Sequence, residues 1–213
     1  MADHTTYGLV CSELSEDLSK TNLGELKLDS FQDNSVKIKI KAASLNFPDL
    51  LMTQGKYQNR PNLPFALGME GAGIVEKIGS EVSSLKEGDE VMFGGWGHGA
   101  IAESIILPEG LVSLKPKSLN FSEAASFKTA YLTAYVGLIR RGELKQGETL
   151  LVHGASGGVG MAAVQMGKLY GARVIASGTS DEKLKIVKTW GADEIINTGL
   201  EGSVSFREEV KDL

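Results

Sequence analysis

The sequence predicts an α/β protein in which a β-rich part is followed by a parallel sheet with helices between its strands. Up to about residue 120, short apolar runs alternate with turns rich in Gly, Pro, Asn and Asp, which is typical of a barrel-like or sandwich-like β unit. Beyond Asn120, three short apolar runs about 20 residues apart are separated by helical stretches, which is typical of βαβ units. These two patterns place one domain at residues 1–122 and a second at residues 123–213.

The composition narrows the class of protein. The chain has 213 residues, of which 42% are hydrophobic and 23% are charged, and these are ordinary values for a globular protein. No apolar run approaches the roughly 18 residues of a membrane span, and a net charge of −5 without a long basic block argues against nucleic-acid binding. The single cysteine, Cys11, excludes a disulfide framework and a four-cysteine zinc site. Because residues 1–6 lack a signal or transit pattern, the cytoplasm is the expected location.

Within the β-rich part, the clearest strand lies at residues 36–41, where Val and Ile alternate with Lys, as on a strand with one solvated face. Shorter apolar runs predict further strands at residues 73–75, 91–93 and 101–107. Turns are expected where Gly, Pro, Asn and Asp gather, at residues 59–64, 87–89 and 94–99.

The second part is predicted to alternate helix and strand. Helices are expected at residues 122–138 and 159–170, and the second of these is small and apolar nearly all round, so it should be buried. A third helix is expected to begin with a capping box at residues 179–182. Its apolar residues Leu184, Val187 and Trp190 are expected to face inward. The strands are predicted at residues 149–153, 173–177 and 194–197.

The most informative segment is a glycine-rich loop at residues 154–160, between a predicted strand and a predicted helix. Such a loop lets the backbone approach a pyrophosphate, and the helix N-terminus offers free N–H groups and a partial positive charge. The spacing is G-x-x-G-x-x-G, and a second strand follows about 20 residues later, a context that favours a dinucleotide site over a purely structural turn. The candidate cofactor-binding residues are Gly154, Ala155, Ser156, Gly157, Gly158, Val159 and Gly160.

The end of the second strand predicts which dinucleotide binds. Enzymes that use NAD place an Asp or Glu there to hold the ribose 2′-hydroxyl, whereas enzymes that use NADP remove the acid and add a cation. Gly178 stands where the acid is expected, Ser177 precedes it, and Lys183 is close enough in sequence to meet a phosphate. We therefore predict NADPH as the cofactor. The alternative for Lys183 is an ordinary solvated helix lysine.

Several segments, in this order, resemble one enzyme family. They are KAASLNFPD at 41–49, PFALGMEGAG at 64–73, EGDEV at 87–91, TAY at 133–135 and the glycine loop. With these motifs the chain resembles the medium-chain dehydrogenase/reductase superfamily, in its zinc-independent quinone oxidoreductase branch. The resemblance implies a GroES-like β-barrel domain with the substrate cleft, followed by a Rossmann-type nucleotide-binding domain. It also implies hydride transfer from NADPH to a quinone or an α,β-unsaturated carbonyl.

The zinc-dependent alcohol dehydrogenases of the same superfamily bind their catalytic metal through three side chains. The matching positions here are Asn46, Met69 and Thr129, and none of these is a good zinc ligand. Glu70 is present, but one carboxylate cannot hold zinc alone. We therefore expect no metal. Without a Lewis acid, reduction of an electron-poor quinone or enone is easier to support than oxidation of an alcohol.

The resemblance also implies the catalytic residues. Asn46 is expected to form a hydrogen bond near the nicotinamide and the substrate, and Thr133 is expected to help seat the nicotinamide ring. Tyr57 is expected to line the cleft and to donate a proton or a hydrogen bond. The alternatives are a loop-stabilising amide for Asn46 and a packing aromatic for Tyr57.

The length is short for this fold, because a dinucleotide domain has about six strands and residues 149–213 provide only three. We therefore expect the N-terminal part of a longer enzyme, cut within its Rossmann domain, with an open sheet edge that favours association. Two other functions stay open: an enoyl-thioester (acyl-CoA) reductase, and a catalytically idle nucleotide-binding fragment. The expected partner is a small molecule, and a homodimer is expected of the full-length enzyme.

Overall fold

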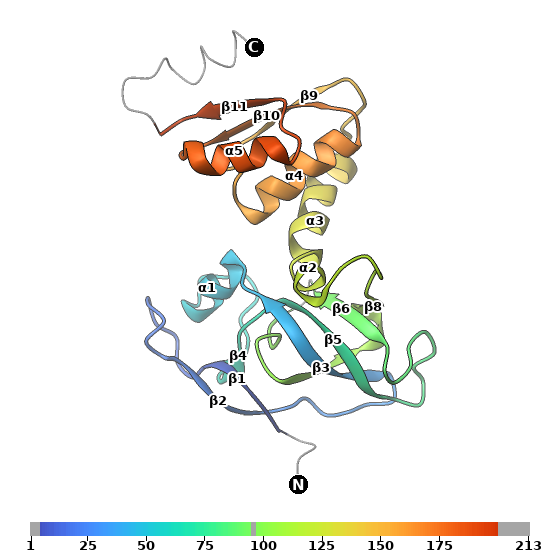
Figure 1. The fold of residues 1–213 in the computed structure, drawn as a ribbon. Coiled ribbons are helices and arrows are strands. Elements are labelled where there is room, and N and C mark those ends of the chain that lie inside the picture. Colours follow the sequence, from blue (N-terminus) through green and yellow to red (C-terminus); the bar gives the residue numbers. More distant parts are fainter. Residues whose placement is uncertain (1–4, 95–96, 200–213) are drawn as a thin grey trace. The chain divides into compact units, whose positions relative to one another are not determined.

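The computed structural model describes residues 5–94 and 97–199 and divides into two compact units that meet in sequence between Thr129 and Ala130. Figure 1 draws the strands of the first unit in blue to green and those of the second in orange to red. The division lies a few residues after the expected boundary at 122/123. The reason is that helix α2 (Phe121–Ala125) packs on the strands of the first unit, with Ala124 and Ala125 buried against Ala72.

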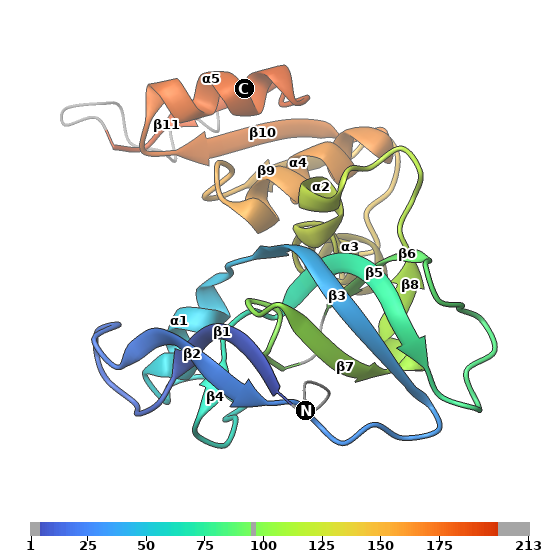
Figure 2. The ribbon, with the colours of Figure 1, turned by 60° about the horizontal axis from the view of Figure 1, so that its bottom comes forward.

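The first unit is built from two antiparallel sheets. The larger sheet has the strand order β7-β3-β5-β6-β8, and the smaller one has the order β2-β1-β4. The strands of the larger sheet are β3 (Ser35–Ser44), β5 (Glu70–Ile78), β6 (Glu90–Gly94), β7 (Ser104–Pro108) and β8 (Val112–Leu114). Those of the smaller sheet are β1 (Thr5–Cys11), β2 (Thr21–Lys27) and β4 (Phe65–Ala66). Figure 2 shows β3 and β5 side by side, as their pairing requires.

Backbone hydrogen bonds join the two sheets. The N–H of Leu9 in β1 donates to the carbonyl of Ile101, and the N–H of Glu103 donates to the carbonyl of Tyr7, both at 2.9 Å. The β-rich unit predicted for the first half of the chain is therefore confirmed, and its sheets close toward a barrel. The strand predicted at residues 101–107 begins later than expected, at Ser104, because residues 101–103 make these contacts to β1 instead.

The alternation along β3 explains the core of this unit. Val36 and Ile38 are fully buried, whereas Lys39 and Lys41 are exposed, as the period of two predicts for a strand with one solvated face. A short helix, α1 (Phe47–Thr53), follows β3, and a 3₁₀ turn (Glu109–Leu111) precedes β8.

The second unit contains the parallel sheet. Its strands have the order β11-β10-β9 and are all parallel, which confirms the predicted βαβ units. The elements are β9 (Thr149–Val152), α4 (Gly158–Leu169), β10 (Arg173–Gly178), α5 (Asp181–Thr189) and β11 (Glu194–Asn197). Within the described ranges, no helix is long and apolar enough to cross a membrane.

The stretch predicted to be helical at residues 122–138 is mostly helical, but it is not one continuous helix. The chain instead forms α2, then α3 (Lys128–Tyr135), then a π-helical turn (Val136–Arg141). The first helix begins earlier than expected because Asn120 caps it: its side chain accepts the N–H of Glu123 at 2.9 Å, and the Glu123 carboxylate accepts the N–H of Asn120 at 2.8 Å.

Two burial expectations for the helices of the second unit are also wrong. Trp190 lies just beyond the end of α5 and is 57% exposed, while Leu184 and Val187 are buried as expected. Helix α4 is not buried all round, because only the face that packs on β9 and β10 is covered and Leu169 is 83% exposed. A capping interaction does begin α5, where the Ser180 hydroxyl accepts the N–H of Lys183 at 3.4 Å.

Candidate functional site

The glycine loop of the second unit connects the end of β9 to the start of α4. Gly154 has a φ of +61°, a conformation that glycine adopts without strain. Ala155 is fully buried and donates its N–H to the carbonyl of Ser177 at 3.0 Å, which ties the loop to the end of β10. A Cβ atom at Gly160 would lie 2.4 Å from the carbonyl oxygen of Gly154. Gly160 is therefore required for the close approach of helix and loop.

The outer side of the same loop is open. A Cβ atom at Gly154 or Gly158 would meet no atom within 4 Å, and Ser156 and Val159 are exposed. The first turn of α4 leaves backbone N–H groups without helical partners, and these groups with the helix dipole favour an anion. The residues present therefore fit a pyrophosphate group, as the sequence motif requires.

The end of β10 lies beside this loop. A Cβ atom at Gly178 would be 3.9 Å from the Ser156 hydroxyl oxygen and 3.3 Å from a methyl group of Leu184. Ser177 is 2% exposed, and its hydroxyl oxygen is 2.9 Å from Nδ1 of His153. The hydroxyl of Ser177 is thus engaged beneath the loop. Lys183 is exposed in the first turn of α5.

In the first unit, a polar cluster surrounds the buried carboxylate of Glu70, which is 1% exposed. One of its oxygens accepts the Ser44 hydroxyl at 2.6 Å and the Asn46 side-chain amide at 3.0 Å. The other oxygen accepts the backbone N–H of Thr129 at 2.8 Å. The amide of Asn46 also donates to the Ser44 hydroxyl oxygen at 3.2 Å. Asn46 itself is half-buried, so a bound molecule can reach it.

A second buried carboxylate supports the same segment. Asp49, 1% exposed, accepts the backbone N–H of Asn46 at 2.7 Å and that of Gly68 at 2.9 Å. Burial raises the pKa of Asp49 above its ordinary value, the two N–H donors oppose that rise, and the charge of Glu70 adds to it. The side chain of Asp49 therefore holds two segments in place: the loop that contains Asn46 and the segment that precedes Glu70.

The three positions expected from the resemblance to match zinc ligands lie near Glu70 in space or in sequence. Asn46 and Thr129 bond to its carboxylate, and Met69 precedes it in the chain. An amide, a thioether and a hydroxyl are poor zinc ligands, and all three donors around Glu70 already use its oxygens. In the part of the chain that the structure describes, no group of three His, Cys, Asp or Glu residues could hold a metal ion. This donor set does not fit zinc.

The two other predicted catalytic residues lie in different surroundings. Tyr57 is half-buried and packs against the small core of Cys11, Met52, Phe65 and Leu67. Thr133 is on an exposed position of α3 and belongs to the second unit. The structure thus connects Asn46 to Glu70 by a hydrogen bond, and it connects Ser177 to His153.

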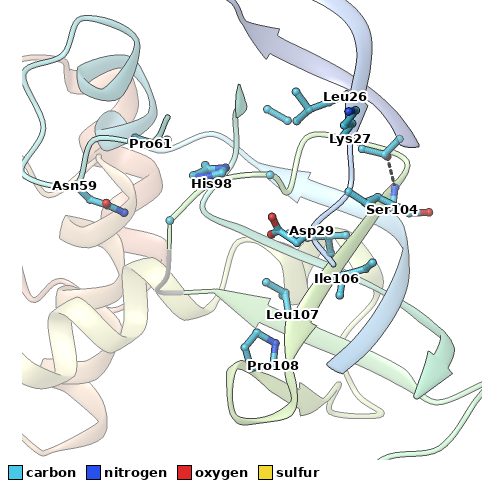
Figure 3. Close-up of a pocket in the computed structure, with 16 residues that line it drawn as sticks. Leu26, Lys27, Asp29, Asn59, Pro61, His98, Ser104, Ile106, Leu107 and Pro108 are labelled. Carbon is cyan, nitrogen blue, oxygen red and sulfur yellow. Dashed lines mark hydrogen bonds between the residues drawn. The ribbon is translucent and has the colours of Figure 1, made fainter. Parts of the chain in front are cut away.

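The first unit also contains a cavity of about 250 Å³. Figure 3 shows the polar side chains of Asp29 and His98 at this cavity together with the apolar side chain of Leu107. Burial lowers the pKa of His98, and the charge of Asp29 opposes that change. Among the described residues that line the cavity, neither Asn46 nor Tyr57 occurs.

Sequence reasoning gave Asp49 no role and noted Glu70 only as a carboxylate that cannot hold zinc alone. The signal for both was their place inside motifs: Asp49 ends KAASLNFPD, and Glu70 lies in the middle of PFALGMEGAG. A buried acid inside an otherwise apolar motif requires hydrogen-bond donors nearby, and this requirement could have pointed to Asn46.

Comparison with known protein families gives two matches. Residues 32–117 match the family described as alcohol dehydrogenase GroES-like domain, and residues 158–213 match the family described as zinc-binding dehydrogenase. The first range contains all the strands of the larger sheet, and the second begins at the start of α4.

Individual relatives agree with these matches. A quinone oxidoreductase from Sus scrofa is 38% identical over 78% of this chain, and a 2-methylene-furan-3-one reductase from Solanum lycopersicum is 40% identical over 81% of it. The crystal structure of the Escherichia coli quinone oxidoreductase complexed with NADPH matches 98% of this chain with a TM-score of 0.85 and 30% identity, and this chain covers 63% of that structure. The chain spans about half the length of the curated relatives, 50% of the first and 48% of the second.

Proposed function

This chain belongs to the medium-chain dehydrogenase/reductase superfamily, in its quinone oxidoreductase branch, and on this basis we propose a function for it. It forms part of an NADPH-dependent reductase of quinones or α,β-unsaturated carbonyl compounds that works without zinc. The second unit would hold the dinucleotide, and the first unit would supply polar groups to the acceptor. When bound, the reduced nicotinamide supplies a hydride, and the chain supplies position and polarity.

One observation carries the proposal for the cofactor: the open glycine loop lies beside a strand end that has no acid. The N–H groups at the start of α4 would bind the pyrophosphate. Gly178 brings no carboxylate that would repel a 2′-phosphate, and the exposed Lys183 would provide the cation. The E. coli relative solved with NADPH supports the same choice.

The side chains proposed to act on the quinone or enone substrate are neutral. Asn46 would form a hydrogen bond to the bound nicotinamide or the acceptor, Thr133 would help seat the nicotinamide ring, and Tyr57 would donate a hydrogen bond or a proton. Of these groups, the hydroxyl of Tyr57 is the donor that would stabilise charge that develops on a carbonyl oxygen, provided that it is held in place before the reaction. The poor ligand set at Asn46, Met69 and Thr129 supports a reaction that proceeds without a metal ion.

The proposal is tested by measuring NADPH consumption with a 1,4-quinone, a small enone and crotonyl-CoA, each in the presence and absence of a strong chelator. We expect turnover with the quinone or the enone at a rate that the chelator does not change. Turnover of crotonyl-CoA alone would instead assign the chain to acyl-thioester reduction. NADPH binding without consumption in any arm would assign it to a catalytically idle nucleotide-binding protein.

A further inference from the structure

The amide nitrogen of Asn46 is held by two groups, and the nearer of them is a buried carboxylate oxygen. The side-chain oxygen of Asn46 faces the backbone N–H of Asp49 in the capping box at the start of α1, and an amide oxygen keeps a second lone pair for a bound molecule. Nδ2 of Asn46 donates to Glu70 at 3.0 Å and to the Ser44 hydroxyl oxygen at 3.2 Å. The backbone N–H of the same residue is fixed separately by Asp49 at 2.7 Å. Main chain and side chain of Asn46 are thus anchored by two different acids.

This arrangement determines which end of the amide is available to a ligand. An amide has a donor end, the NH2 group, and an acceptor end, the carbonyl oxygen. Turning the Asn46 amide by half a turn would place its carbonyl oxygen against an oxygen of Glu70, and two acceptors at hydrogen-bond distance repel each other. Glu70 accepts three donors and is 1% exposed, so it cannot turn away into water. The donor end of Asn46 is therefore committed to the protein interior.

We propose that Glu70 is a positioning residue that fixes the Asn46 amide, so that Asn46 offers a bound molecule its carbonyl oxygen as a hydrogen-bond acceptor. The partner on the bound molecule is then an N–H or O–H group, not a carbonyl oxygen. This proposal rests on the proposed function only in assigning Asn46 to the ligand site. The orientation of the amide can be tested without turnover.

The first test is the exchange of the Asn46 side-chain NH2 protons with water, measured by NMR on the nitrogen-15-labelled chain. The signal is assigned by its loss in N46A. We expect Glu70→Ala to accelerate this exchange at least about tenfold, because a protected buried hydrogen bond is lost. If E70A does not fold, E70Q is used in its place. Its side chain has one acceptor oxygen for three donors, so the exchange of the Asn46 NH2 protons is expected to rise by a smaller factor, about three or more. Exchange in E70Q equal to that of the unchanged chain would overturn the proposal.

The second test is a double-mutant cycle in turnover, with N46A, E70Q and the two combined. If Glu70 acts through Asn46, E70Q lowers kcat/KM in the presence of Asn46 but changes it by less than about twofold when Asn46 is already Ala. Equal factors in both backgrounds would mean that Glu70 has a separate structural role, and would overturn the proposal.

A matched control separates positioning from general destabilisation. Glu123 accepts the N–H of Asn120 at 2.8 Å in an analogous asparagine-and-acid pair at the start of α2. E123Q should therefore lower stability without changing the exchange of the Asn46 amide. If the unchanged protein shows no turnover with any acceptor, the proposed function fails, and the exchange measurement still decides whether Glu70 orients Asn46.

Discussion

Enzymes that use NAD have an acid at the end of this strand, which binds a ribose hydroxyl. Here β10 ends in a glycine, and the missing charge has a direct chemical consequence. A carboxylate at this position would repel a 2′-phosphate, and the repulsion would be strong in the partly desolvated site. Gly178 brings no charge, and its Cβ position is bordered by Leu184 and Ser156. A single side chain can therefore change the preferred dinucleotide.

We predict that Gly178→Asp shifts preference from NADPH toward NADH, measured as the ratio of their dissociation constants. The ratio should change by at least about tenfold, which corresponds to 1.4 kcal/mol. Gly178→Ala is the control, because its methyl group enters the same space without charge, at 3.3 Å from Leu184. A ratio that changes as much in G178A as in G178D would show that size, not charge, determines the effect.

Two glycines of the loop are expected to respond differently to the same added methyl group. Gly160→Ala places a Cβ atom 2.4 Å from the Gly154 carbonyl oxygen, so the loop must move, whereas Gly158→Ala meets nothing within 4 Å. We predict that G160A lowers the melting temperature and weakens NADPH binding. G158A should leave the melting temperature of the ligand-free chain unchanged and weaken NADPH binding alone, because its methyl group occupies the open cradle. A melting temperature lowered equally by both variants would contradict this account of the loop.

At the scale of elements, the parallel strands were predictable and the helix boundaries were not. Residues 149–153, 173–177 and 194–197 are apolar runs at regular spacing, and the structure has strands at these places. The helix after Asn120 was predicted, but its bounds were not: a capping box at Asn120 and Glu123 begins it one residue early, and the chain leaves the helix again at Ser126. Trp190 was placed inward from periodicity, but α5 ends at Thr189 and no longer fixes its direction.

Asp193 connects α4 to β10 and is expected to stabilise the second unit. Its carboxylate accepts the Lys168 ammonium at 2.8 Å and the backbone N–H of Val174 at 2.7 Å. We predict that Asp193→Ala lowers the melting temperature by about 2–4 °C, because the N–H of Val174 loses its acceptor. Glu194→Ala is the control, since it removes only an exposed pair with Arg173 at 3.9 Å. Equal losses in the two variants would contradict the role given to Asp193.

The same side chain predicts a pH dependence. Hydrogen bonds from Lys168 and then from Val174 lower the pKa of Asp193 below its ordinary value of 3.8. A carboxylate with a lowered pKa in the folded state contributes stability above its unfolded pKa and loses that contribution as pH falls through the folded value. The difference in melting temperature between the unchanged chain and D193A should therefore be full at pH 5 and above and shrink below 3.8. A difference that stays constant at acidic pH would contradict this assignment.

At the scale of the whole molecule, the sequence motifs identified the family and the glycine loop, but not the cluster around Glu70. Asn46 and Thr129 lie 24 and 59 residues from Glu70 in the chain. Such residues meet only when the sheet forms, and no local pattern indicates their hydrogen bonds. The roles of Asn46, Tyr57 and Thr133 toward a ligand, the homodimer and the cytoplasmic location stay predictions.

Removal of metal ions tests the expectation that the chain binds no zinc. The poor ligand set at Asn46, Met69 and Thr129 predicts that prolonged dialysis against a chelator leaves the melting temperature unchanged. Metal analysis of the purified protein before dialysis should find zinc well below one equivalent. One equivalent of zinc that is lost together with stability would contradict the reading of these three positions.

In the proposed function, the protein uses NADPH to reduce an electron-poor acceptor without a metal ion. The most direct measurement is kcat/KM for NADPH and for NADH with one quinone, in protein dialysed against a chelator and kept in it. We predict that NADPH is favoured by at least about tenfold and that added zinc does not raise the rate. Equal efficiency with NADH, or turnover that appears only when zinc is added, would contradict the claim.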